Sequence, residues 1–482
     1  MLYRFLRACA TLGLACASLL AQAQPIPVEV DAALLRAKIP REAVSLLVLD
    51  AERDSRAPAR LSHLAELARN PASVMKLVTT YAGLDLLGPA FSWSTPVYLE
   101  GTLHNGVLQG NVYIKGQGDP KLVLERLWLL LRRLQGLGVL QIHGDIVLDH
   151  SAFTLNDSDP ARFDGEPLRP YNASPDALLI NYKSLLLTIS PALSDQRALV
   201  QYDPPLYGVQ TQASVALVGG PCGDYRAQLK ADFSNPLQIR LLGQYPASCG
   251  EKVWPVAYAD PTRFAARAVQ GLWLSMGGKL DGVVRDGLVP QALLARPPAM
   301  ESSSPALAEI IRDINKFSNN VMAEQLFLTL GREAPGTAGS DGVGFEAARS
   351  VLQSWWKDRI GGEAPLIENG AGLSRQDRIS AESLGRLLRV AYNSPFMSEL
   401  MSSLPISGVD GTLKRYQTRR PGSAHLKSGT LNGVLARAGY VEGRSGKRYV
   451  LVALINHANA NTEAARQFME TLVDWAAQSP PH

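Results

Sequence analysis

The chain has 482 residues and a formal net charge of +4, and hydrophobic residues make up 46% of it against 19% for charged residues. Because this length exceeds that of one average domain, two or more domains and a large buried core are expected. The composition excludes a disordered protein. The charge is small and scattered, so the sequence predicts no nucleic-acid partner.

The N-terminus, "MLYRFLRACATLGLACASLLAQAQ", has the pattern of a secretory signal peptide. Two arginines precede an apolar run, and small residues that suit cleavage end at Ala23. We predict a signal over residues 1–23 and a mature periplasmic protein. A lipoprotein site at Cys16 is the alternative, which is disfavoured because the residues after it are still apolar. No later apolar run approaches the roughly 20 residues that span a membrane, so no stable membrane insertion is expected.

A strand and a helix are the first elements expected after the signal. Residues 43–54, "AVSLLVLDAERD", indicate a strand followed by a turn. Residues 73–87, "SVMKLVTTYAGLDLL", bring Leu77, Tyr81 and Leu84 near one face of a helix. Gly88 and Pro89 then end that helix.

The chain becomes strand-rich from residue 94, where apolar and polar residues alternate and Asn105-Gly106 signals a hairpin turn. One helix is expected within this stretch, near residues 122–134. Cys222 and Cys249 are the two cysteines that follow the signal. In an exported protein they are most simply a disulfide, because no histidine cluster accompanies them. The seven histidines match no metal-ligand spacing, so no metal site is predicted.

Helices are expected again after Pro297-Pro298 and the serine run that follows. Residues 424–429, 434–443 and 447–457 then indicate three neighbouring strands. A terminal helix follows and is expected to pack on the sheet. Its apolar side carries Ala464, Phe468, Leu472 and Trp475.

These elements predict an α/β fold that is split in sequence. Residues 24–95 and 298–482 would form one domain. Residues 96–297 would form one or two inserted strand-rich domains that contain the disulfide, since roughly 200 residues is a typical size for such units.

The stretch "NPASVMK" places Ser73 and Lys76 three residues apart at the start of the predicted helix. Such residues share a helix face, so the Lys76 amine can reach the Ser73 hydroxyl. Free N–H groups at a helix N-terminus favour the negative charge of an activated nucleophile. An ordinary helix cap is the alternative, because Pro and Ser are enriched at helix starts. A second match, Ser354 to Lys357, lies mid-helix without free N–H groups and is not expected to react.

Two further motifs accompany this pair. "FSNN" supplies Ser318 and Asn320, and "LKSG" supplies Lys427, Ser428 and Gly429 at a strand end. The set S-x-x-K, S-D-N and K-T-G is the signature of penicillin-binding proteins and class A β-lactamases. Three motifs in this order are far more specific than one.

The motifs have a coherent acid and base chemistry. Lys76 as the neutral amine would take the proton of Ser73. Since the pKa of lysine is roughly 10.4, a neutral amine near pH 7.5 requires a depression of about 3 units, which burial and the cation Lys427 both favour. Ser318 can relay a proton toward a leaving amine, and Asn320 can hold Lys76 and a substrate amide.

The strand motif is suited to binding a peptide end. Lys427 and Ser428 would bind a terminal carboxylate, and Gly429 lets the substrate backbone approach. The backbone N–H groups of Ser73 and Thr430 are the natural oxyanion donors. Taken alone, Lys427 would be interpreted as a solvated lysine at a strand end.

At these motifs the chain resembles the class C low-molecular-weight penicillin-binding proteins, which are D-alanyl-D-alanine carboxypeptidases and endopeptidases of the bacterial envelope. The resemblance covers nearly the whole mature chain. It rests on "SVMKLVTTYAGLDLLGP", "YIKGQGDPKL", "PYNASPDALLINYKS", "SNNVMAEQLF", "ENGAGLSR" and "LKSGTLNGVLARAGYV".

The resemblance implies a β-lactamase-like transpeptidase domain, in which helices flank an antiparallel sheet. It implies that Ser73 is acylated, that Lys76 is the general base, and that Ser318 with Asn320 and Lys427 with Ser428 and Gly429 form the second and third motifs. It also implies peptidoglycan stem peptides as substrates, β-lactam antibiotics as covalent inhibitors, and no metal or cofactor.

The chain departs from the family pattern in two places. Ser428 stands where threonine is usual, which removes one methyl group and is expected to tune specificity without abolishing activity. Asn369 and Ala371 stand where aspartate and serine are usual, which leaves the role of this loop open.

We therefore predict an exported serine hydrolase that acts on peptides ending in D-Ala-D-Ala through an acyl-enzyme on Ser73. A β-lactamase is one alternative, and a catalytically weak wall-binding protein of the same fold is another. The sequence leaves open the balance of carboxypeptidase and endopeptidase activity, the role of the insertion and the oligomeric state.

Overall fold

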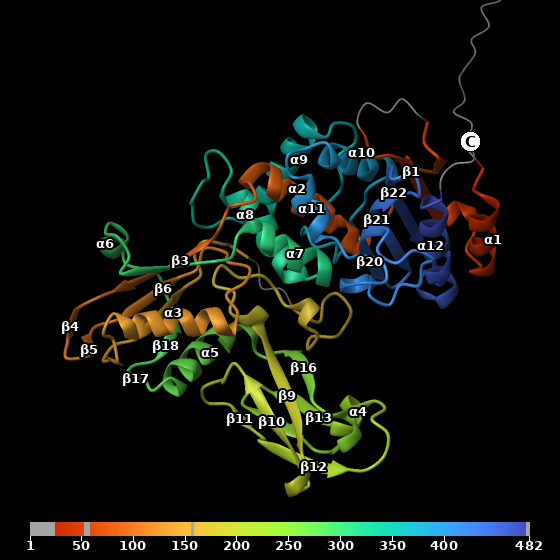
Figure 1. The fold of residues 1–482 in the computed structure, drawn as a ribbon. Helices are drawn as coiled ribbons and strands as arrows, with labels where there is room; N and C mark the ends of the chain where they lie inside the picture. Colours follow the sequence, from red (N-terminus) through yellow and green to blue (C-terminus); the bar gives the residue numbers. More distant parts are fainter. Residues whose placement is uncertain (1–24, 53–57, 156–158, 479–482) are drawn as a thin grey trace, which may run out of the picture.

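The computed structural model describes residues 25–52, 58–155 and 159–478 (Figure 1). The predicted signal peptide lies outside the described residues. Figure 1 shows a sheet with helices on both faces and, beside it, an extended part built from several smaller sheets. Within the described ranges, no helix is both long and apolar enough to cross a membrane.

The main sheet has five strands, and every neighbouring pair is antiparallel. It combines two strands from the N-terminal part of the chain with the three predicted C-terminal strands. In spatial order the strands are β2 (Leu61–His63), β1 (Val44–Asp50), β22 (Arg448–Asn456), β21 (Val434–Glu442) and β20 (Ala424–Leu431).

One face of this sheet is covered by α1 (Val28–Arg36) and α12 (Glu463–Ala476). Successive side chains of a strand point to opposite faces, so Leu451 of β22 packs among these two helices while Val450 packs on the other face. Phe468 of α12 is fully buried in this layer. The prediction that the terminal helix packs on the sheet is therefore confirmed.

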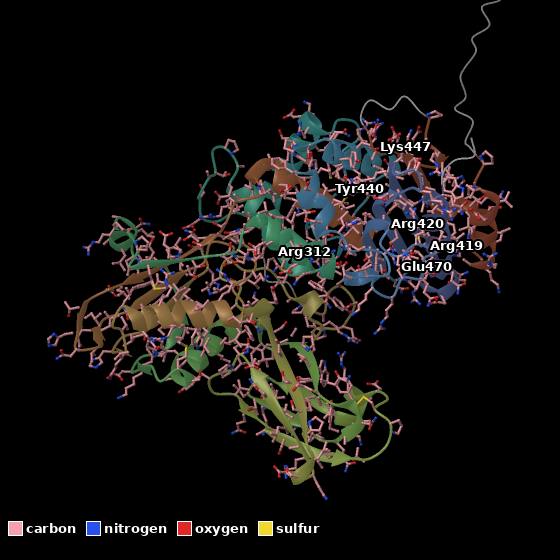
Figure 2. The ribbon with its side chains drawn as sticks, in the orientation of Figure 1. Arg312, Arg419, Arg420, Tyr440, Lys447 and Glu470 are labelled. Carbon is pink, nitrogen blue, oxygen red and sulfur yellow. A yellow bond between two sulfur atoms is a disulfide. The ribbon has the colours of Figure 1, made fainter. Side chains whose placement is uncertain are left out.

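Six helices lie on the opposite face of the sheet. The side chains of Figure 2 include the buried Tyr440 of β21, whose hydroxyl donates a hydrogen bond to the Leu388 carbonyl at 2.8 Å and ties the sheet to this layer. Every residue of the central helix, α8, is buried. The helices are α2 (Lys76–Leu87), α7 (Leu307–Phe317), α8 (Asn320–Arg332), α9 (Phe345–Arg359), α10 (Ala381–Tyr392) and α11 (Met397–Ser403).

The residues between α2 and α7 form four smaller sheets with their own buried core. The first two of these sheets each combine parallel and antiparallel strand pairs. Their strands are β3 (Ser94–Leu99), β6 (Val112–Lys115), β8 (Ile146–Asp149), β18 (Val284–Asp286) and β19 (Met300–Ser303) in one, and β4 (Thr102–His104), β5 (Val107–Gln109), β7 (Gln141–Ile142) and β17 (Lys279–Leu280) in the other.

The other two sheets lie at the bottom of Figure 1. The larger one is mostly antiparallel, and the disulfide is attached to it. Their strands are β9 (Ser184–Ala192), β10 (Arg197–Asp203), β12 (Ser214–Val218), β15 (Gln244–Pro246) and β16 (Lys252–Ala257) in one, and β11 (Gln210–Thr211), β13 (Ala231–Asn235) and β14 (Gln238–Leu241) in the other.

The predicted hairpin and helix of the insertion are confirmed. Asn105 and Gly106 both have positive φ in the turn between β4 and β5, as this hairpin type requires. The helix expected near residues 122–134 is α3 (Leu124–Gly136).

The prediction of a single helix in this stretch is wrong. The structure also contains α5 (Pro261–Ser275), together with the short helices α4 (Tyr225–Leu229) and α6 (Gln291–Leu294). The Asp260 side chain accepts a hydrogen bond from the Arg263 amide, and Pro261 occupies the first turn, so α5 begins with ordinary start signals. The helix was not predicted because the sequences on both sides of it are strand-like.

The chain passes between the main sheet and the insertion along two adjacent strands. β3 and β19 pair with each other, and the Trp93 amide donates to the Ser304 hydroxyl at 2.9 Å. The predicted boundary at 95/96 falls inside β3, and the boundary at 297/298 falls just before β19. The division into domains stays a proposal, which the separate core of the insertion supports.

Candidate active site

Ser73 lies in a short 3₁₀ turn, Ala72–Met75, which directly precedes α2. The helix expected from residue 73 therefore starts as this tighter turn. Asn70 holds the turn to the sheet, because its backbone N–H donates to the Asn456 Oδ1 at 2.9 Å while its side-chain oxygen accepts from the Ala72 amide at 2.8 Å. Ala72 has a φ of +47°, a left-handed conformation that is strained for a residue with a β-carbon and is frequent at functional sites.

The Lys76 amine is the centre of the site. Its Nζ donates to the Ser73 Oγ at 3.0 Å, to the Asn320 Oδ1 at 2.6 Å and to the Ala371 carbonyl oxygen at 2.5 Å. Lys76 is fully buried. The predicted contact between the Ser73 hydroxyl and the amine is thus present in the structure.

Burial lowers the pKa of Lys76 to about 7, although the carboxyl groups of Glu324 and Asp377 oppose the shift. The sequence predicts a lowering of the Lys76 pKa by about this amount. An amine with this pKa is substantially neutral near pH 7.5, as a general base must be.

The second motif occupies the corner between α7 and α8. Ser318 has a φ of +57°, and this left-handed residue ends α7 so that the chain can turn into α8. The Asn319 side chain caps α8 by accepting from the Met322 amide at 3.1 Å. Asn320 donates its amide to the Tyr171 carbonyl of the insertion at 3.0 Å. The corner therefore links α8 to both Lys76 and the insertion.

The third motif lies on β20, the last strand in the order of the main sheet. Lys427 is fully buried, and its Nζ donates to the Ser318 Oγ at 2.9 Å. Burial lowers the pKa of Lys427 well below its ordinary value, and the charges of Lys76 and Arg437 add to that shift. The Ser428 hydroxyl pairs with the Thr412 hydroxyl at 2.6 Å.

Position 429 on β20 requires a residue without a side chain. A β-carbon at this position would lie 2.5 Å from the Pro71 carbonyl oxygen and 3.1 Å from the backbone nitrogen of Ser73. The strand and the turn that carries Ser73 are therefore in direct backbone contact. Thr430 follows on the same strand, with an exposed side chain.

The loop "ENGAGLSR" closes the site behind Lys76. Its Gly370 carbonyl accepts from the Thr79 hydroxyl at 2.7 Å, in addition to the Ala371 contact with the Lys76 amine. The Asn369 side chain accepts from the Ala371 amide at 3.0 Å, a turn that an aspartate would also form. The two departures from the family pattern therefore leave the backbone of the loop in place to hold Lys76.

The structure adds site residues that the motifs did not indicate. Glu324 lies one turn after Asn320 on α8, and burial raises the pKa of its carboxyl to about 8. Burial also raises the pKa of Asp377 to about 6. The charged residue inside the apolar helical pattern "VMAEQLF" was the one available sequence signal for Glu324.

The second S-x-x-K match does not belong to the site. Ser354 is exposed in the middle of α9, and the neighbouring Trp355 and Trp356 are buried in the core. The expectation that Ser354 lacks the surroundings of a nucleophile agrees with this position. Across the three described ranges, no group of three or more His, Cys, Asp or Glu residues is arranged to hold a metal ion.

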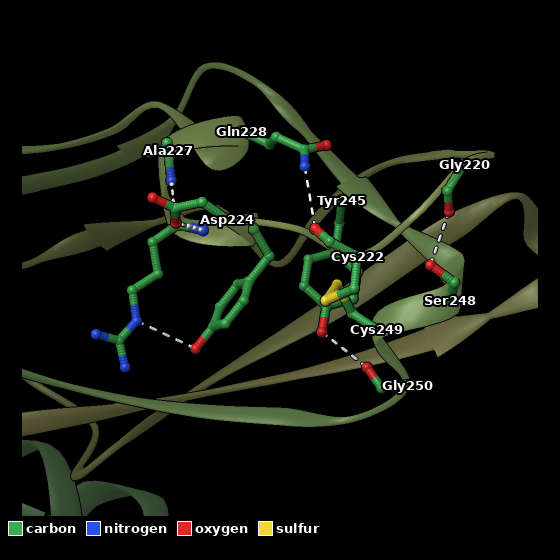
Figure 3. The surroundings of a disulfide bond; sticks show 11 residues. Gly220, Cys222, Asp224, Ala227, Gln228, Tyr245, Ser248, Cys249 and Gly250 are labelled. Carbon is green, nitrogen blue, oxygen red and sulfur yellow. Dashed lines mark hydrogen bonds between the residues drawn. A yellow bond between two sulfur atoms is a disulfide. The ribbon is translucent and has the colours of Figure 1, made fainter. Parts of the chain in front are cut away.

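The predicted disulfide is present between Cys222 and Cys249 (Figure 3). It joins the segment before α4 to the turn after β15 and packs in the core of that sheet. The Tyr245 hydroxyl donates to the Gly250 carbonyl at 2.7 Å beside it. The disulfide therefore stabilises the insertion and belongs to none of the three motifs.

Comparison with known families covers nearly the whole described chain. The sequence pattern of the D-Ala-D-Ala carboxypeptidase 3 (S13) family matches residues 27–479. The chain belongs to this family. Its activity is that of a serine-type D-alanyl-D-alanine carboxypeptidase, as the sequence predicts. Because the match includes the insertion, neither a β-lactamase nor a binding protein without activity is favoured.

Curated relatives agree with this assignment. The chain is 28% identical over 410 residues to the D-alanyl-D-alanine carboxypeptidase of Actinomadura sp. (strain R39), covering 81% of this chain and 73% of that one. It is 25% identical over 394 residues to the D-alanyl-D-alanine carboxypeptidase DacB of Haemophilus influenzae, covering 80% of each.

Solved structures share the fold. Penicillin-binding protein 4 (dacB) from Haemophilus influenzae superposes with a TM-score of 0.73 at 21% identity, over 93% of this chain and 99% of that one. The predatory endopeptidase Bd3459 from Bdellovibrio bacteriovorus gives a TM-score of 0.52 at 16% identity, over 89% and 92% of the two chains. The predicted penicillin-binding fold class is confirmed.

Proposed function

We propose that Ser73 is the acylated nucleophile of the D-Ala-D-Ala carboxypeptidase reaction. The observation that carries the proposal is the buried Lys76 amine, 3.0 Å from the Ser73 hydroxyl and with a pKa lowered to about 7. Neutral Lys76 takes the hydroxyl proton as the Ser73 oxygen attacks the carbonyl carbon of the penultimate D-alanine. A tetrahedral oxyanion forms, and the backbone N–H groups of Ser73 and Thr430 stabilise it.

The next step releases the terminal residue. The C–N bond breaks, and the Ser318 hydroxyl delivers a proton to the departing amine, while the proton taken by Lys76 replenishes the network. The 2.9 Å contact from the Lys427 amine to the Ser318 hydroxyl supports proton transfer through Ser318, and the 2.6 Å contact with the Asn320 Oδ1 holds the Lys76 amine in position. Water then attacks the acyl-enzyme, with Lys76 again acting as base, and regenerates Ser73.

The third motif is proposed to select substrates with a free C-terminus. Lys427 and the Ser428 hydroxyl would bind the terminal carboxylate, one by charge and one by a hydrogen bond. The lowered pKa of Lys427 means that a bound carboxylate would favour its protonated form. Substrate binding would thus restore the positive charge that burial disfavours.

We further propose that the enzyme works in the periplasm on peptidoglycan stem peptides and is acylated by β-lactams. The signal-like N-terminus supports export. The solved structure of the Haemophilus influenzae penicillin-binding protein 4 with a β-lactam supports acylation in a protein of this fold. Endopeptidase activity on cross-linked peptides is proposed beside the carboxypeptidase activity.

Release of D-alanine from a synthetic stem peptide tests this assignment. The wild-type protein should release one D-alanine for each peptide, and Ser73→Ala should release none. Ser318→Ala should reduce the rate by about 10²-fold to 10⁴-fold, because it removes one proton-transfer group. Full activity of Ser73→Ala would overturn the proposed nucleophile.

A further inference from the structure

Two pockets on the insertion join into a groove that begins at the active site. The proximal pocket has a volume of about 360 Å³ and lies between residues 317–321 of the second motif and insertion residues that include Leu186. The distal pocket has a volume of about 590 Å³ and is lined by Trp128 and Asp203. Glu125 lines both pockets, so they meet at that residue. Figure 1 shows α3, which carries Glu125 and Trp128, extending from the loops beneath α7 toward β4 and β5.

The proximal pocket lies on the leaving-group side of the reaction. Ser318 lines this pocket and is the group assigned to protonate the departing amine. The amine must therefore lie within hydrogen-bond distance of the Ser318 hydroxyl when the C–N bond breaks. Whatever is attached to that amine extends toward the proximal pocket. A single D-alanine is small for a pocket of about 360 Å³, a size in the range that holds whole ligands.

We propose that this groove binds the peptide arm that departs when a cross-linked stem peptide is cleaved. The inference rests on the proposed function and assigns the insertion a role in it: recognition of the larger leaving group. The ligand class is a stem peptide whose cross-linking side-chain amine is the leaving group and whose free N-terminus supplies a further amine. The insertion would thereby set the preference for cross-linked over uncross-linked peptides.

The groove presents apolar side chains that nothing in the described chain covers. Phe317 is 69% exposed, Leu186 37%, Trp128 43% and Leu129 52%, and all four line one of the two pockets. Soluble proteins rarely leave several large apolar side chains exposed along one groove unless it binds a partner or ligand. Because the groove begins next to Ser318, we assign it to the substrate.

The charges of the groove complement an amine. Glu125 and Asp203 are the charged residues that line the two pockets, and neither pocket is lined by lysine or arginine. Among the described residues, the Glu125 side chain has no hydrogen-bond or ion-pair partner. Asp203 accepts a hydrogen bond from the Gln201 side chain at 2.8 Å and has no cationic neighbour within ion-pair distance in the described chain. Glu125 lines both pockets and Asp203 lines the distal one, so the two carboxylates are suited to the free N-terminal amine of a departing stem peptide.

Comparison of two substrates tests the proposal. The kcat/KM for a cross-linked dimer of stem peptides with free N-termini should fall about 5-fold to 20-fold in Leu186→Ser and in Trp128→Ala, since each loses apolar contact. The kcat/KM for an uncross-linked stem peptide ending in D-Ala-D-Ala should stay within about twofold of wild type. Glu125→Gln should weaken cleavage of the dimer, and acetylation of the N-terminal amine of the departing stem should remove that effect.

Leu199→Ser is the matched control, because Leu199 is 53% exposed on β10 and lines neither pocket. It should leave both substrates unaffected. Equal losses on the two substrates in the groove variants, or no loss on the dimer, would overturn the proposal. If wild type releases D-alanine from the stem peptide yet leaves the dimer uncleaved, the groove proposal fails while the carboxypeptidase assignment stands.

Discussion

Gly429 and Pro71 are in backbone contact: a β-carbon on Gly429 would lie 2.5 Å from the carbonyl oxygen of Pro71. This contact fixes the distance between the strand that would bind the substrate and the turn that carries Ser73. Two elements that are far apart in sequence therefore share one rigid arrangement at the site.

Gly429→Ala should separate the strand from the nucleophile turn and slow acylation by penicillin about 100-fold, because displacements near 1 Å are costly to a reaction of this kind. Stopped-flow or gel measurement of acylation checks this. Gly136→Ala is the control, since a β-carbon there meets nothing within 4 Å. Equal acylation rates in the two variants would show that the contact does not matter.

The acylation rate should rise with pH through about 7. Lys76 must be neutral to act as base, and burial lowers its pKa to about 7 while Glu324 and Asp377 oppose that shift. Asp377→Asn removes one negative charge, so the pKa of Lys76 should fall further and the acidic limb should move down by about 0.5 to 1 pH unit. The pH dependence of penicillin acylation measures the limb.

Asp358→Asn is the control for the pH profile, because Asp358 is exposed on α9. It should leave the limb unchanged. A limb that moves to higher pH in Asp377→Asn would contradict the assignment of Lys76 as the base, since loss of a neighbouring negative charge cannot raise the pKa of an amine.

The Ser428 hydroxyl should contribute to carboxylate recognition. Ser428→Ala should lower kcat/KM on a peptide ending in D-Ala-D-Ala about 10-fold to 100-fold, the effect of losing one hydrogen bond to a charged group. Ser428→Thr keeps the hydroxyl and should retain most activity. A peptide with an amidated C-terminus is the control, and the Ser428→Ala effect should be much smaller on it.

The disulfide should stabilise the insertion without affecting the reaction. Changing Cys222 and Cys249 together to serine should lower the free energy of unfolding by about 2 to 4 kcal/mol. Penicillin acylation at 25 °C should remain at the wild-type rate, because both residues pack in the core of the β9–β16 sheet. Chemical denaturation with and without reductant checks this, and the double variant should not respond to reductant.

The residues that meet at the candidate site could be predicted because short motifs contain them. Ser73 and Lys76 are separated by one helical turn, and local geometry alone brings them together. The surroundings of Lys76 could not be predicted in the same way. Asp377 reaches its neighbourhood only through the tertiary fold, and Thr412 meets Ser428 because a 3₁₀ turn packs against β20.

For the fold as well, elements with a clear local sequence pattern could be predicted and long-range pairings could not. The strands near the C-terminus alternate or run apolar clearly enough to be identified, and β20, β21 and β22 confirm them. β1 joins their sheet through pairing with β22, in which Ile455 lies 411 positions after its partner Val44 and thus beyond any local pattern. Helix α5 was missed because its neighbours are strand-like, even though Asp260 and Pro261 mark its start.

The central claim is that Ser73 is the residue that becomes acylated. Labelling with a fluorescent penicillin, followed by gel electrophoresis, compares wild type with Ser73→Ala and with Ser354→Ala, the exposed serine of the second S-x-x-K match. We predict full labelling of Ser354→Ala and complete loss of labelling in Ser73→Ala. Labelling of Ser73→Ala at the wild-type level would contradict the account.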